Sequence, residues 1–434
     1  MNVTIGFVGL AAFFVLIALK VPVAIAMAVV AFCGVWFMFG LNPAIGVLAN
    51  TPYDFVASWT LSAVPMFLLM GFVAYYSGLT GGLFDAAKVG LRKVPGGLGI
   101  AAILACSGFA AVCGSSLATA ASMGRIAIPE MVKAGYKPSF ATGALAAGGT
   151  IGALIPPSIL MIIYGVFSET SVSQVFIGGI TVGLITAASY IAVVLIVALV
   201  RPDVVPRTPF GVDDLDTKKV LTAVWPTLTL IVLIFGGLFS GYFTATEAGA
   251  IGAAGAIVLA IITGKMNWEV FRKSVLDTLG TCASLFIVGV GAVMFTKFLG
   301  LSGAAALIGS TVSGYDLDYM TLMLIIVVIY LVLGTFMEPF GAMLITLPVL
   351  TPVLQHAGID FVWFGVFLVK MLEIGMITPP LGMNVFVIRN VASQYATLGD
   401  IFRGVSLFFA ADMVVVALII AFPMIVMFLP NMFG

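Results

Sequence analysis

Long apolar segments separated by short polar connections fill this sequence of 434 residues. A helix needs roughly 20 apolar residues to cross a bilayer. On that measure the pattern predicts ten spans, at 5–19, 23–40, 61–78, 139–165, 176–200, 220–240, 245–263, 278–300, 363–388 and 404–432. Two further apolar stretches, 98–131 and 319–354, are too long for one crossing and too short for two, so they predict re-entrant helical hairpins. We expect an all-α integral membrane protein.

Composition agrees with this interpretation, since 62% of the residues are hydrophobic and only 8% are charged. The 18 basic residues balance the 18 acidic ones, which gives no reason to expect a nucleic-acid partner. The first segment lacks a basic region before it and a clear cleavage site after it, so we interpret it as a retained span. The four cysteines form no Cys-x-x-Cys pair and predict neither disulfides nor a metal site.

A repeat divides the chain into two halves. The sequence Gly-Ala-Leu-Ile-Pro-Pro at 152–157 returns 223 positions later as Gly-Met-Ile-Thr-Pro-Pro at 375–380. Proline removes a backbone donor and interrupts a helix, so the spans 139–165 and 363–388 are predicted to be broken. We expect a first repeat at 1–200, a polar linker at 201–219 that includes the acidic run 213–216, and a second repeat at 220–434.

The basic residues indicate the orientation of the halves. Fifteen of the 18 fall in connections that the predicted spans place on one face, whereas the connections 41–60, 166–175, 301–318 and 355–362 contain none. Because cytoplasmic loops are enriched in Lys and Arg, both termini are predicted to be exterior and the two repeats to be inverted. The stretches 41–60 and 264–280 are too polar to span and are predicted to be interfacial arm helices.

Breaks and hairpin tips are the predicted site, because unwound backbone inside a membrane is tolerated where it lines a cavity. The freed carbonyls and nearby hydroxyls suit a hard cation, and the amides that start a half-helix suit an anion. Small and hydroxyl residues also serve ordinary helix packing in membranes. Candidate sodium ligands are Gly114, Ser115, Thr119, Gly149, Thr150, Pro156, Gly334, Glu338, Thr378 and Pro379; candidate substrate-binding residues are Ser115, Ser116, Thr119, Lys297, Glu338 and Asn384.

Charged residues within or near spans are further candidates, because a charge at membrane depth is costly unless it is paired or solvated. Lys370 and Glu373 stand three positions apart, which predicts an ion pair on one helical face. Lys297 has no evident local partner, so it either neutralises an anion or extends to the interface. Glu247 and Asp412 complete this group.

Four motifs together resemble the large membrane subunit of the tripartite ATP-independent periplasmic (TRAP) transporters. They are Gly-Ser-Ser-Leu-Ala-Thr at 114–119 with Met123-Gly124, the run 149–158, Phe-Thr-Ala-Thr-Glu-Ala at 243–248, and Pro-Pro-Leu-Gly-Met-Asn at 379–384. The resemblance covers nearly the whole chain. It implies a sodium-coupled importer of small organic acids, of the dicarboxylate or sialic acid class, located in the bacterial inner membrane and working as an elevator without an organic cofactor.

The same resemblance implies two protein partners, a small four-helix membrane subunit and a periplasmic substrate-binding protein. The chain contains no Gly-x-x-x-x-Gly-Lys-Ser/Thr phosphate loop, so an ion gradient is the expected driving force. A self-sufficient divalent-anion symporter is the main alternative, and a channel is a weaker one. An enzyme is not expected, because the single histidine, His356, is predicted to lie in an exterior connection.

Overall fold

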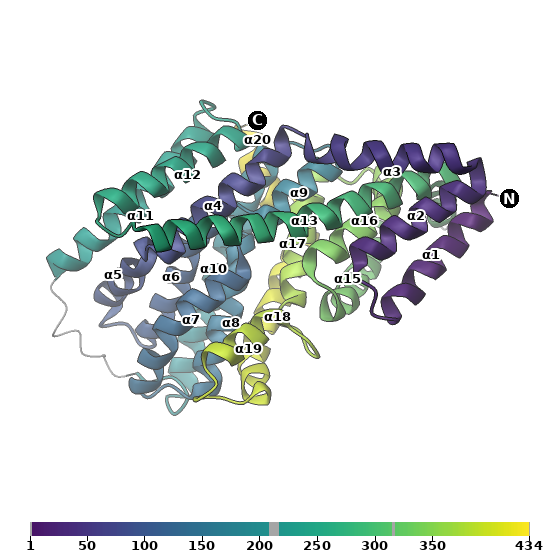
Figure 1. Cartoon of the computed structure of the whole chain (residues 1–434). Helices are drawn as coiled ribbons and strands as arrows, with labels where there is room; N and C mark the ends of the chain where they lie inside the picture. The colour runs from purple at the N-terminus through teal and green to yellow at the C-terminus, as the bar shows by residue number, and fades with distance from the viewer. Residues whose placement is uncertain (1, 208–216, 315–316, 434) are drawn as a thin grey trace.

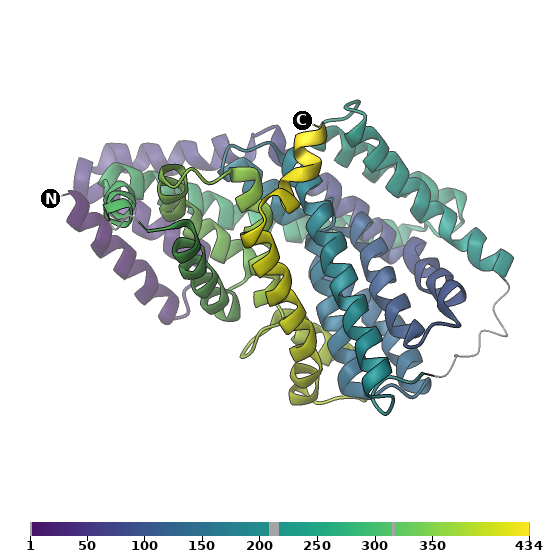
Figure 2. The ribbon, with the colours of Figure 1, turned by 180° about the vertical axis from the view of Figure 1, so that it is seen from behind.

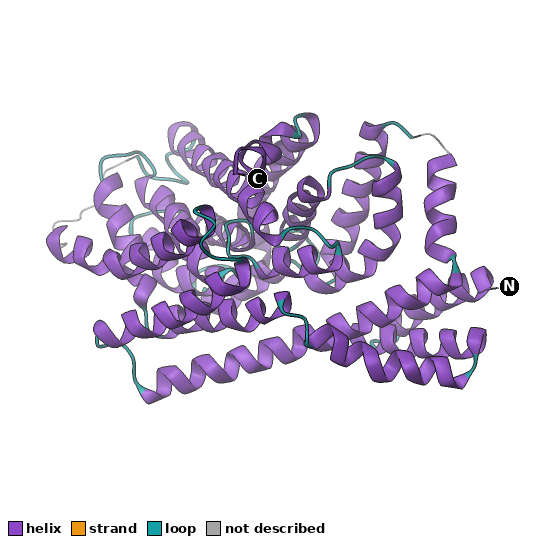
Figure 3. Ribbon diagram, turned by 90° about the horizontal axis from the view of Figure 1, so that it is seen from above, coloured by secondary structure: helices purple, strands orange, loops and turns teal. Residues whose placement is uncertain are grey.

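The computed structural model describes residues 2–207, 217–314 and 317–433, and this part of the chain contains helices and no strand (Figures 1 and 3). The acidic run predicted in the linker, 213–216, lies outside the described residues. The helices are α1 (Asn2–Ala18), α2 (Val23–Phe39), α3 (Leu41–Val56), α4 (Ala63–Tyr76), α5 (Gly82–Leu91), α6 (Gly97–Cys113), α7 (Ser116–Lys133), α8 (Pro138–Thr150), α9 (Ile159–Phe167), α10 (Val172–Val200), α11 (Thr217–Phe239), α12 (Ala245–Ile262), α13 (Trp268–Ser302), α14 (Ala304–Gly314), α15 (Tyr319–Phe336), α16 (Pro339–His356), α17 (Phe361–Gly375), α18 (Met383–Val391), α19 (Leu398–Ala421) and α20 (Met424–Phe433).

Both predicted hairpins are pairs of helices joined by a two-residue turn. The first consists of α6 and α7 with its turn at 114–115, and the second of α15 and α16 with its turn at 337–338. Both predicted breaks are also present, because no α-helix covers 151–158 or 376–382. Unbroken helices through the two Pro-Pro pairs would have removed the reason to expect a site there.

The helix order repeats along the chain in two inverted halves. Equivalent helices α6 and α15, and α8 and α17, begin 222 and 223 positions apart. The three most extensive helix contacts join one half to the other: α2 lies against α13, α4 against α12, and α8 against α19. The repeats are therefore not two separate packed units.

Helices of both halves instead form two groups, which we name the frame and the hairpin body. The frame comprises α1–α4 and α11–α13, and α13 runs across the middle of the molecule in Figure 1. The hairpin body comprises α6–α10 and α15–α20, and its long helices α10 and α19 stand side by side in Figure 2. Helices α5 and α14 connect the two groups, α5 packing on α6 and α11, and α14 on α16 and α1.

By length and composition, six helices of the described chain can cross a membrane, or seven if the bent pair 41–56 and 60–76 is one span. Helices α1 and α2 are also apolar but shorter, at 17 residues each. Two predictions were wrong in detail. The arm 264–280 is not separate, because α13 continues unbroken from Trp268 to Ser302. The last span, 404–432, is divided between α19 and α20, since helix geometry is lost at Phe422 and Pro423.

Candidate substrate and ion site

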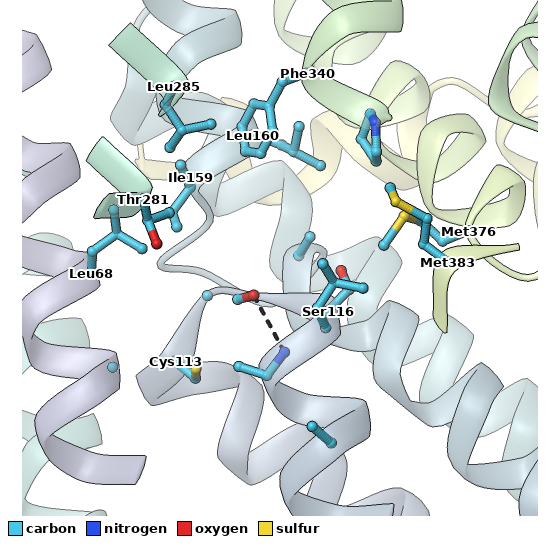
Figure 4. Close-up of a pocket in the computed structure, with 18 of the residues that line it drawn as sticks. Leu68, Cys113, Ser116, Ile159, Leu160, Thr281, Leu285, Phe340, Met376 and Met383 are labelled. Atoms are coloured by element: carbon cyan, nitrogen blue, oxygen red, sulfur yellow. Dashed lines mark hydrogen bonds between the residues drawn. The ribbon is translucent and has the colours of Figure 1, made fainter. Parts of the chain in front are cut away.

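Both hairpin tips and both breaks border one cavity of about 620 Å³ (Figure 4). Frame helices α4 and α13 form the opposite wall, where Leu68, Thr281 and Leu285 face Ser116, Met376 and Met383 of the hairpin body. Cavities of this size are typical of small-molecule sites. Among the predicted residues, the cavity is lined by Gly114, Ser115, Ser116, Glu338 and Glu373.

The first hairpin tip fits tightly into the first break. Gly114 ends α6 with a φ of 62°, a conformation that favours glycine, and Ser115 caps α7 by accepting a 3.4 Å hydrogen bond from the Ala118 amide. A Cβ atom on Gly114 would lie only 2.2 Å from the Pro157 carbonyl oxygen. Only glycine allows this approach, so the tip and the break are one structural unit.

Oxygen atoms gather where this tip meets the break. Thr119 donates a 2.8 Å hydrogen bond to the Ser115 carbonyl, and a Cβ on Gly152 would lie 2.7 Å from Thr119 Oγ1 and 2.8 Å from that carbonyl. A Cβ on Gly149 would similarly lie 3.1 Å from the Ser116 carbonyl.

Asn384 from the second half completes this cluster. Its Nδ2 donates to the Ala146 carbonyl at 3.3 Å and would lie 3.1 Å from a Cβ on Gly149. Its Oδ1 is fully buried and has no hydrogen-bond partner in the part of the chain that the structure describes. A buried acceptor is normally satisfied, so this oxygen fits a cation or a water molecule as its partner. Carbonyl, hydroxyl and amide oxygens of this kind suit sodium.

The second hairpin and the second break are less enclosed than the first pair. Gly334 and Gly375 bring α15 and α17 into backbone contact, because a Cβ on Gly375 would lie 2.6 Å from the Gly334 Cα. Thr378 donates to the Ile374 carbonyl at 2.6 Å, and its break leaves Pro379 exposed, whereas Pro156 in the first break is buried. The two breaks therefore share a position in the repeat but differ in enclosure.

Two hydrogen-bonded carboxylates show the contacts that sequence reasoning missed. Ser116 Oγ donates to Glu373 Oε2 at 2.6 Å, which joins the first tip to the second broken helix. The predicted ion pair between Lys370 and Glu373 was wrong, because Lys370 Nζ pairs with Asp412 Oδ1 at 2.5 Å. Lys370 and Asp412 are both fully buried.

Two other predicted residues lie away from the cavity lining. Lys297 on α13 donates to Thr51 Oγ1 on α3 at 3.1 Å. Glu247 and Thr244 form a capping box at the start of α12, with Glu247 accepting at 2.9 Å from the Thr244 amide. This contact gives Glu247 a structural role.

Sequence analysis also missed the cavity-lining residues that the frame contributes. Thr281 and Ser284 on α13 and Tyr75 on α4 line the cavity. Their only signal was hydroxyl groups in apolar spans, which packing explains equally well. No described residue of the lining is Lys, Arg or His.

Comparison with known proteins identifies the family. Residues 10–425 match the DctM component of the tripartite ATP-independent periplasmic transporters. The chain belongs to this family. Like other large TRAP permeases it is a multi-pass membrane protein of a transport system, as the resemblance implied.

Two curated relatives of this TRAP permease are similar over most of its length. The C4-dicarboxylate TRAP transporter large permease protein DctM of Pseudomonas aeruginosa is 34% identical, over 91% of this chain and 94% of that protein. The isethionate TRAP transporter permease protein DctMQ of Oleidesulfovibrio alaskensis is 32% identical, over 88% of this chain and 60% of that protein. The YdaH transporter of Alcanivorax borkumensis has the same fold, with a TM-score of 0.61 over 88% of each chain at 15% identity.

Proposed function

We propose that this permease imports a small organic acid together with sodium, after a periplasmic binding protein has delivered the acid. The observation that carries the proposal is that both hairpin tips and both breaks border one cavity. In secondary transporters, interrupted helices of inverted repeats form the central substrate and ion site. The similar C4-dicarboxylate and isethionate permeases favour an organic anion as cargo.

Sodium supplies the positive charge that the cavity lining lacks. Glu338 and Glu373 line the cavity, and the described lining has no basic side chain to attract an anion. A cation held by the oxygens around Gly149, Gly152 and Asn384 would offset this negative charge before the cargo enters. We place a second cation near Gly334, Glu338, Thr378 and Pro379, by the symmetry of the repeats.

Movement of the hairpin body against the frame is the proposed elevator step. The cavity lies at their boundary, with α4 and α13 on the frame side, so displacement of the hairpin body would carry the site past a fixed wall. The small membrane subunit would enlarge the frame. We place the complex in the inner membrane with both termini periplasmic, because the basic connections would then face the cytoplasm.

Reconstitution tests this function directly. Liposomes that contain the permease and its small subunit should accumulate the cargo only when two conditions are met. The periplasmic binding protein must be present, and the sodium gradient must be directed inward. Uptake by the permease alone would favour the self-sufficient symporter. Flux that does not saturate with cargo concentration would favour a channel.

A further inference from the structure

A buried polar network lies where the two halves meet, outside the cavity lining. Tyr190 Oη on α10 donates to Asp412 Oδ2 on α19 at 2.7 Å, and these residues stand 222 positions apart. They therefore occupy equivalent places in the two repeats. Asp412 also binds Lys370 on α17, which donates a second bond of 3.1 Å to Thr186 Oγ1 on α10.

Tyr190 connects this network to the first break. Its oxygen lies 3.1 Å from Thr150 Oγ1, the last residue of α8. Because the Tyr190 hydrogen is directed to Asp412, the Tyr190 oxygen is available as an acceptor for the Thr150 hydroxyl. The Thr150 hydroxyl also lies 2.7 Å from the Ala147 carbonyl, so Tyr190 competes with α8's own backbone for that hydrogen.

Every residue of this network is buried. Tyr190, Asp412, Lys370 and Thr186 are completely buried, and Thr150 is 1% exposed. No bulk water replaces a lost bond there, so each donor and acceptor depends on its protein partner. The Thr150 hydroxyl therefore has two competing acceptors, Tyr190 on α10 and the Ala147 carbonyl of its own helix. Thr150 is followed directly by the turn at Ile151–Ala153 that meets the oxygen cluster.

We propose that Tyr190, held by the Lys370–Asp412 ion pair, is a positioning residue for the sodium site at the first break. The inference rests on the proposed sodium function and adds residues outside the cavity to it. Tyr190 touches neither ion nor cargo. It sets the geometry of the α8 end, so its loss weakens sodium binding more than it disturbs the fold.

Sodium alone serves as the probe, with the purified permease and small subunit in lipid nanodiscs. The unfolding temperature is measured against NaCl, with choline chloride holding ionic strength constant, because a ligand of the folded state raises that temperature. In Tyr190→Phe, the NaCl concentration for half of the shift should rise about three- to tenfold, the effect of one hydrogen bond.

Tyr164→Phe is the matched control. Tyr164 on α9 is completely buried in the hairpin body and donates one 2.7 Å hydrogen bond, to the Phe361 carbonyl. This variant should lower the unfolding temperature without sodium but keep the wild-type sodium midpoint. An equal change of midpoint in both variants would overturn the inference, since it would show a general loss of packing.

A second variant tests the contribution of the ion pair. Lys370→Met with Asp412→Leu removes both buried charges together, which proteins tolerate better than removal of one. Its sodium midpoint should rise as in Tyr190→Phe. A wild-type midpoint in either variant overturns this inference alone, whereas a wild-type protein indifferent to sodium overturns the proposed sodium function as well.

Discussion

Ser116 of the first hairpin donates a 2.6 Å hydrogen bond to Glu373 of the second broken helix, 257 positions away. Both residues line the cavity and are nearly buried. The bond therefore joins the two halves at the cavity wall. It also explains how a carboxylate is tolerated at this depth without an ion pair of its own among the described residues.

Ser116→Ala should reduce sodium-driven uptake while the complex still assembles. The change leaves Glu373 buried without its donor, which costs about 1–3 kcal/mol. Ser107→Ala is the control, because Ser107 bonds only the Ile103 carbonyl of its own helix, at 3.0 Å. Uptake in proteoliposomes is the measurement, and equal activity of both variants would remove Ser116 from the site.

Gly114→Ala should abolish uptake, because its Cβ would collide with the Pro157 carbonyl at 2.2 Å and displace the hairpin tip. Gly78→Ala isolates the cost of the backbone conformation. Gly78 has a φ of 65°, close to the 62° of Gly114, but nothing lies within 4 Å of its added Cβ. Both variants carry the same backbone strain from a positive φ. Similar uptake by the two would therefore show that the tip need not fit the break.

Thr119→Ala should raise the sodium concentration for half-maximal uptake, with cargo KM at saturating sodium little changed. Its hydroxyl belongs to the oxygen cluster beside Gly152. Thr142→Ala is matched, since Thr142 is equally buried and bonds a helix carbonyl, that of Pro138, at 2.7 Å. A sodium dependence that stays at the wild-type value in Thr119→Ala would exclude this residue as a ligand.

Lys370→Met should destabilise the protein by about 3–5 kcal/mol, because Asp412 would remain charged and buried without its partner. Adding Asp412→Leu should recover part of the loss. Thermal unfolding of the purified complex distinguishes the three proteins. A double variant less stable than Lys370→Met would show that the pair contributes more than mutual neutralisation.

The sequence was sufficient for the elements of this fold that depend on local chemistry. The hairpins predicted at 98–131 and 319–354 occur at 97–133 and 319–356, because the length of the apolar stretches determines them. The breaks follow from the Pro-Pro pairs. The cluster of Gly114, Ser115, Thr119 and Gly149 follows from the repeat, since equivalent breaks and tips meet in one place.

Long-range contacts were beyond such reasoning. Lys370 has a carboxylate three positions away but pairs with one 42 positions away, because tertiary packing brings α19 against α17. Sequence analysis separated the arm 264–280 from the following span on polarity alone. Its Glu269 and Lys273 form a 2.7 Å pair that supports continuous helix, so hydropathy misplaced the boundary.

Cross-linking of the frame to the hairpin body tests the central claim that these groups move past each other. A Cβ on Gly71 of α4 would lie 3.2 Å from the Cα and 2.9 Å from the carbonyl oxygen of Cys113, at the end of α6, so a small backbone shift would let a Gly71→Cys side chain form a disulfide with Cys113. We predict that oxidation of this variant stops uptake and that reduction restores it. Gly71→Ala is the control, and its uptake should not change with either treatment. Full uptake by the cross-linked protein would contradict the account, because the cargo would then cross without movement of the first hairpin.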